Sequence, residues 1–73
     1  MKVTIEYCIQ WDYSNLAASL AERLMKEYDA VVDLIESRGG AYEITVNGDL
    51  FFSKLLTGHF PNDDRIIQDL ADH

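Results

Sequence analysis

Apolar and polar residues alternate along the first stretch of the chain, residues 2–7. Val3, Ile5 and Tyr7 fall on one side of this period of two, and the residues between them are polar. β-branched and aromatic residues at alternate positions are typical of a strand with one buried face. The pattern therefore predicts a first strand, and Cys8 follows directly at its end.

After residue 12 the apolar residues recur at spacings of three and four, which predicts an amphipathic helix of about four turns. Its apolar stripe consists of Leu16, Ala17, Leu20, Ala21, Leu24, Met25 and Tyr28. Asp12 or Ser14 is the predicted N-cap, because the side-chain oxygen of either can accept a first-turn N–H. The stripe needs a sheet to pack against, and Cys8 precedes the positive end of this helix.

Three further strands are predicted downstream. Residues 30–35 form a short apolar run, and a strand here would lie parallel to the first strand in a right-handed crossover. Residues 41–46 and 49–53 flank Asn47-Gly48, which is a strong hairpin signal. The alternation in this hairpin predicts that Tyr42, Ile44, Val46, Leu50 and Phe52 belong to the core.

The end of the chain predicts a loop at residues 55–61 and a final helix capped by Asn62, with Asp63 and Asp64 in its first turn. The buried face of this helix is predicted to be Ile66, Ile67, Leu70 and Ala71. The order β-α-β-β-β-α predicts an α/β (α+β) fold, in which two helices pack on a mixed four-stranded sheet. Residues 1–73 are predicted to form a single domain.

Composition narrows the choice of partners. The formal net charge is −7 and the six Lys and Arg residues are scattered, which argues against nucleic acid and anionic membranes. The acidity is explained by a solvated surface or by a basic protein partner. No apolar run reaches the ~20 residues of a membrane span. The first residues include Glu6 and do not resemble a signal peptide, so a cytoplasmic location is expected.

Three segments together follow the pattern of a known family. They are Tyr7-Cys8-Ile9-Gln10-Trp11-Asp12-Tyr13, Gly39-Gly40-Ala41-Tyr42-Glu43-Ile44-Thr45-Val46-Asn47-Gly48-Asp49-Leu50-Phe51-Phe52-Ser53-Lys54 and Gly58-His59-Phe60-Pro61. From about Val3 to Leu70 the chain resembles the selenoprotein W-like group, also called the Rdx family. The resemblance implies a thioredoxin-like fold and a thiol oxidoreductase role, in which glutathione or a partner protein exchanges with the first cysteine. It implies no cofactor beyond glutathione as a co-substrate.

The chain departs from this family pattern at one position. Cys8 matches the nucleophilic cysteine, Tyr13 matches the aromatic residue, and Trp11 occupies the position of the second cysteine or selenocysteine. Cys8 is the only cysteine, so a mixed disulfide at Cys8 has no resolving thiol in its own chain. A helix N-terminus favours the Cys8 thiolate, whereas Glu6, Asp12 and the overall negative charge oppose it. The sequence leaves open whether Cys8 is exchange-competent or structural.

A second hypothesis is a redox-inactive protein-binding module. Its partner surface would use Trp11, Tyr13, His59 and Phe60 within and beside residues 55–60, with a second copy of the chain as one candidate partner. Trp11 has an alternative as a packing residue. No metal site is expected, because neither histidine stands at ligand spacing from Cys8. The two hypotheses predict different outcomes for the variant Cys8→Ser. A binding module would keep its function, and a thiol redox protein would lose it.

Overall fold

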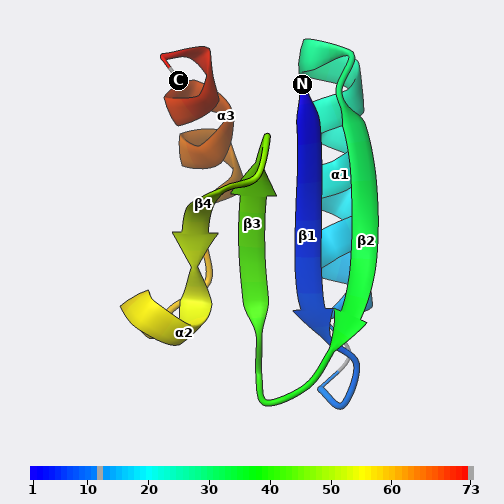
Figure 1. The fold of residues 1–73 in the computed structure, drawn as a ribbon, viewed down its shortest axis with the longest axis vertical. Helices are drawn as coiled ribbons and strands as arrows, with labels where there is room; N and C mark the ends of the chain where they lie inside the picture. Colours follow the sequence, from blue (N-terminus) through cyan, green and yellow to red (C-terminus); the bar gives the residue numbers. More distant parts are fainter. Residues whose placement is uncertain (12, 73) are drawn as a thin grey trace.

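The computed structural model describes residues 1–11 and 13–72 and contains one four-stranded sheet (Figure 1). Its strands are β1 (Lys2–Cys8), β2 (Val31–Ser37), β3 (Tyr42–Val46) and β4 (Asp49–Ser53), and their order is β2-β1-β3-β4. β1 pairs in parallel with β2 and antiparallel with β3, and β4 pairs antiparallel with β3. The predicted mixed sheet, crossover and hairpin are confirmed.

Two longer helices, α1 (Ser14–Tyr28) and α3 (Asp63–Ala71), pack on one face of this sheet. α1 runs along β1 and β2, and α3 lies beyond β3 and β4 near the same end as the N-terminus (Figure 1). The core between helices and sheet consists of Val3, Ile5, Tyr7, Ala17, Leu20, Ala21, Leu24, Ala30, Tyr42, Ile44, Val46, Ile66 and Leu70. None of the described helices is long and apolar enough to cross a membrane.

The prediction of a loop at residues 55–61 is partly wrong, because a third helix, α2 (Lys54–Thr57), follows β4 directly. The Ser53 side chain accepts a hydrogen bond from the Leu56 N–H at 3.1 Å, as an N-cap does. Gly58, with a φ of 81°, ends the helix and donates its N–H to the Lys54 carbonyl at 2.8 Å. Four residues with caps at both ends are too short to show an apolar period.

Some predicted core residues are exposed instead. Leu50 is 57% exposed because the register of β3 with β4 shifts between Ile44 and Thr45. This shift pairs Leu50 with Thr45, which points away from the helices. Leu16 and Met25 flank the buried stripe of α1 and are about half exposed. Ala71 is exposed as well.

The N-cap of α1 also differs from the prediction. Tyr13 holds the N-cap position without a side-chain cap hydrogen bond, and Ser14 is already helical. The other candidate, Asp12, lies outside the described residues. The Tyr13 N–H donates to the Cys8 carbonyl at 3.3 Å, and the Tyr13 carbonyl accepts from the Ala17 N–H at 3.0 Å. Backbone hydrogen bonds therefore connect the end of β1 to the start of α1.

Candidate functional site

Cys8 is the last residue of β1, and the backbone fixes it on three sides. Its N–H donates to the Ala41 carbonyl at 2.8 Å, just before β3 begins. The next residue, Ile9, donates its N–H to the carbonyl of Ser37 at the end of β2, at 3.1 Å. With the bond from Tyr13, these contacts hold Cys8 where β1, β2, β3 and α1 converge.

The free Cys8 side chain has no solvent-exposed surface, although Cys8 ends β1 and is followed directly by a turn at residues 9–11. Burial raises the pKa of the thiol. Backbone N–H groups of Gly40, Gln10 and Trp11 donate to the sulfur and outweigh burial, so the pKa of Cys8 lies below its ordinary value. The donors come from two loops and not from the first turn of α1. The site therefore stabilises a thiolate mainly through backbone dipoles.

Lys54 supplies the positive charge at this site. Its charge contributes to lowering the pKa of Cys8, and its Nζ donates to the Gly40 carbonyl at 3.4 Å. Lys54 follows β4 and is 46 positions from Cys8 in sequence, so an inspection of residues near Cys8 misses it. The sequence feature that could have identified Lys54 is the Ser53-Lys54 pair in the family pattern. The carboxylate of Glu6, which is expected to oppose the thiolate, accepts a hydrogen bond from the Ser37 hydroxyl at 2.8 Å.

Gly40 is close to the Trp11 ring. Gly40 has a φ of 76°, and a Cβ added to it would lie 2.6 Å from Trp11 Cζ3. A side chain at position 40 would therefore displace the indole or the N–H that reaches the sulfur. The Trp11 side chain remains 62% exposed, so the indole lies over the glycine without being enclosed.

Aromatic residues form a cluster beside the thiol. Tyr13 contacts Trp11, Tyr42 and Phe60 edge to face, with ring centroids 6.2, 6.4 and 4.6 Å away. The Lys54 Nζ lies 5.6 Å from the Tyr13 ring centroid and 5.2 Å from that of Phe60. The structure thus brings together three of the four predicted partner-surface residues, and Tyr42 joins them from the core.

His59 is the predicted residue that the cluster leaves out. Its ring lies 5.8 Å from that of Phe52, and its Nδ1 is 2.8 Å from the Phe60 carbonyl. Within residues 1–11 and 13–72, no group of three or more His, Cys, Asp or Glu side chains is arranged to hold a metal ion. His73 lies outside the described residues.

Glu43, in the middle of the family pattern, has a positioning role in the structure. Its carboxylate accepts the N–H groups of Lys54 and Leu55 at 2.8 and 3.3 Å, and also the Ser53 hydroxyl. A carboxylate at these N–H groups stabilises the first turn of α2. Glu43 therefore fixes the start of the helix that carries Lys54 to Cys8.

The fold and site define a class: a small α+β domain with one cysteine, at the end of its first strand, among backbone donors. A family model described as the Rdx family matches residues 2–72, and the chain belongs to this family. Its expected thioredoxin-like fold is shared by solved structures. A crystal structure from Bordetella parapertussis has a TM-score of 0.91 at 29% identity, covering 99% of this chain and 95% of that one.

Other relatives agree with this assignment. A crystal structure of a selenoprotein W-related protein from Vibrio cholerae has a TM-score of 0.87 at 27% identity, covering 97% of this chain and 92% of that one. Proteins named migration and invasion enhancer 1 are 35% identical in Bos taurus, over 93% of this chain, and 36% identical in Mus musculus, over 90%. The chain spans 60% and 58% of the length of these two relatives.

Proposed function

We propose that this member of the Rdx family is a monothiol redox protein that forms a mixed disulfide at Cys8 with glutathione or with a partner protein. The observation that carries the proposal is the set of three backbone N–H donors at the Cys8 sulfur, with Lys54 as a nearby cation. This environment favours the thiolate, which is the nucleophile in disulfide exchange.

The exchange proceeds in two steps. The Cys8 thiolate attacks one sulfur of oxidised glutathione, a Cys8–glutathione disulfide forms, and one glutathione thiolate leaves. A second glutathione thiolate then attacks the glutathione sulfur of this mixed disulfide. Oxidised glutathione is regenerated and Cys8 leaves as the thiolate. The second step needs an external thiol, because Cys8 is the only cysteine of the chain.

Access to the sulfur limits the rate of this exchange. Cys8 has no exposed surface, and two of the three N–H donors at its sulfur come from residues 10 and 11 in the turn that follows it. An attacking disulfide must reach the sulfur from outside, so this turn has to shift before the reaction. We expect disulfide exchange to be slow in the folded protein and faster in variants in which the turn at residues 9–11 is less stable.

The test is intact mass measurement after incubation with oxidised glutathione near neutral pH, followed by reduced glutathione. We expect one added glutathione on the folded protein and its removal by the reduced thiol. Cys8→Ser is the matched control and should gain no mass. Modification that appears only after unfolding would contradict the proposal and identify Cys8 as a structural residue.

A second candidate function, a protein-binding module, is favoured by the exposed apolar side chains near the aromatic cluster. Trp11 is 62% exposed, and Leu55 and Leu56 of α2 are 61% and 80% exposed. Exposed apolar residues gathered near a reactive group are typical of a partner surface. If Cys8→Ser keeps full activity in a cellular assay that Leu56→Asp abolishes, binding and not thiol exchange is the function.

A further inference from the structure

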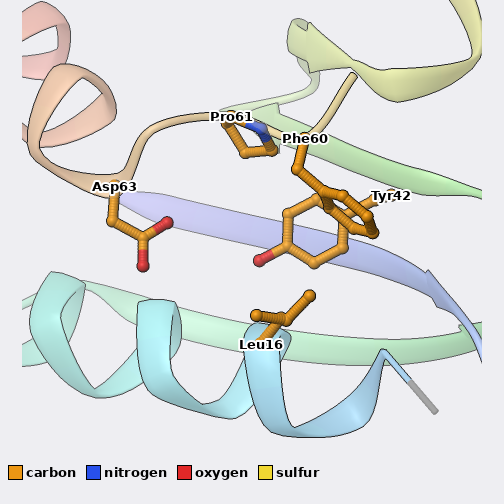
Figure 2. A pocket seen from close by; sticks show the side chains of 5 residues that line it. All are labelled: Leu16, Tyr42, Phe60, Pro61 and Asp63. Carbon is orange, nitrogen blue, oxygen red and sulfur yellow. The ribbon is translucent and has the colours of Figure 1, made fainter. Parts of the chain in front are cut away.

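A pocket of about 190 Å³ lies on the helix side of β3 (Figure 2). Leu16 from the start of α1, Tyr42 from β3, and Phe60, Pro61 and Asp63 from the segment entering α3 line it. The lining is mostly apolar. Pockets for drug-sized ligands measure roughly 300–1,000 Å³. This pocket therefore fits one side chain or one small molecule.

Two polar groups face the interior of this pocket. Figure 2 shows the Tyr42 hydroxyl and the Asp63 carboxylate directed into the same space. Tyr42 is only 1% exposed as a residue, and its hydroxyl borders the pocket. Within residues 1–11 and 13–72, no buried side-chain N or O atom lacks a hydrogen-bond partner, so the hydroxyl is not a buried orphan. Its position at the pocket makes it available to a molecule that enters.

Asp63 lacks a counterion of its own in the described part of the chain. The charge of Arg23 acts on Asp63, but the Arg23 Nη1 forms its ion pair with Asp64 Oδ1 at 2.8 Å. Burial and the charge of Asp64 raise the pKa of Asp63, and Arg23 only partly offsets them. A half-buried carboxylate in these surroundings is stabilised by any cation that reaches it.

We propose that this pocket binds a primary alkylammonium group, with Asp63 as its counterion and the Tyr42 hydroxyl as a hydrogen-bond acceptor. The Phe60 ring and the side chains of Leu16 and Pro61 contact the alkyl chain. The net charge of −7 attracts cations to the molecule as a whole. The group belongs either to a lysine side chain of another protein or to a free amine, and its binding does not depend on Cys8 chemistry.

The test is a titration of the isotope-labelled protein with n-butylammonium, followed by NMR, with 1-butanol as the neutral analogue. We expect saturable shifts at Leu16, Phe60 and Asp63 with the ammonium and none with the alcohol. Asp63→Asn should weaken binding about tenfold or more, because a charge-assisted hydrogen bond is lost. Asp69→Asn is the control, since it removes one charge from an exposed site of the same helix.

Tyr42→Phe keeps the ring and removes only the hydroxyl, so it should weaken ammonium binding several-fold while the fold remains intact. A blocked lysine, with both its amino and carboxyl ends as amides, distinguishes the two sources. If the blocked lysine binds and Asp63→Asn weakens its binding as it does for butylammonium, the pocket is assigned to lysine side chains of proteins. If only butylammonium binds, the pocket is assigned to free amines. Equal affinity for ammonium and alcohol, unchanged affinity in Asp63→Asn, or no binding would overturn the proposal.

Discussion

The Cys8 side chain is buried and the Asp63 side chain is half-buried, and their pKa values are shifted in opposite directions. Burial raises the pKa of each group. At Cys8, backbone donors from residues 10, 11 and 40 outweigh burial, and the pKa is lowered. At Asp63, Arg23 lowers the pKa, but Asp64 and burial together raise it. Burial alone therefore does not determine the ionisation state of an acidic side chain. The hydrogen-bond donors and charges around it decide whether the anion is stabilised.

The Cys8 and Asp63 sites are also suited to two different kinds of chemistry. Cys8 already has donors to stabilise its anion, and it has no exposed surface. Asp63 lines a pocket, and the ion pair of Arg23 is made with its neighbour Asp64. The first site is suited to covalent exchange after a local opening, and the second to reversible binding of a cation.

The largest change is expected from Trp11→Cys, which places a thiol at the position that the resemblance to the family pattern predicts for a second cysteine. The Trp11 N–H donates to the Cys8 sulfur, so the two residues are close. We expect the introduced thiol to attack the Cys8–glutathione disulfide, release glutathione and leave an intramolecular disulfide. Intact mass should show loss of two hydrogens and no adduct. A stable adduct in this variant would mean that the two positions cannot pair.

Gly40→Ala is expected to have the next largest effect. Gly40 has a φ of 76°, and a Cβ would meet Trp11 at 2.6 Å. We expect a loss of stability of roughly 1–3 kcal/mol and a higher Cys8 pKa, because strain and the clash move the N–H away from the sulfur. Gly39→Ala is the control, because its φ of 72° adds similar strain but no atom lies within 4 Å of its Cβ. Equal Cys8 pKa values in the two variants would contradict the role of the Gly40 N–H.

Lys54→Met is expected to raise the Cys8 pKa less than Gly40→Ala does. The Lys54 charge acts on the sulfur through space, and its contribution is smaller than those of the backbone donors. Alkylation rate as a function of pH would measure the shift, with Lys26→Met in the last turn of α1 as the charge-matched control. The pKa difference should shrink at high salt, which screens charges but not backbone hydrogen bonds.

The smallest effect is expected from Asp63→Asn on stability. Because the folded-state pKa of Asp63 is raised, the carboxyl group favours the folded state at pH values below its unfolded pKa, and that advantage is lost as the pH rises through the folded pKa. Asp63→Asn should therefore be slightly more stable than the native chain at neutral pH, with a smaller difference in acid. Thermal unfolding at both pH values measures this. A variant less stable than Asp69→Asn at neutral pH would contradict it.

Most of the fold could be predicted from the sequence, because its signals are local. Periods of two and of three to four residues, and the Asn47-Gly48 turn, correspond to β1, α1 and the β3–β4 hairpin. Leu50 was mispredicted because a register shift in the hairpin interrupts the alternation. The helix α2 was missed because part of its N-terminal stabilisation comes from Glu43, in another strand.

The candidate site could be predicted less completely. Cys8 was identified by its place after the first strand, and Trp11, Tyr13 and Phe60 by their chemistry. The groups that set the state of the thiol, Lys54 and the Gly40 N–H, come from distant segments. Only the topology brings them to the end of β1, so local sequence reasoning counted the opposing acids and missed the donors.

The most direct test of the central claim is the pH titration of Cys8 in the folded protein by thiolate ultraviolet absorbance, with Cys8→Ser as the baseline for tyrosine. Because the folded-state pKa is lowered, the thiolate should stabilise the fold above the unfolded pKa, and this stability is lost as the pH falls through the folded pKa. We predict an inflection below that of the same thiol in the unfolded protein. An inflection at or above that value in the folded protein would contradict a thiolate stabilised by backbone donors.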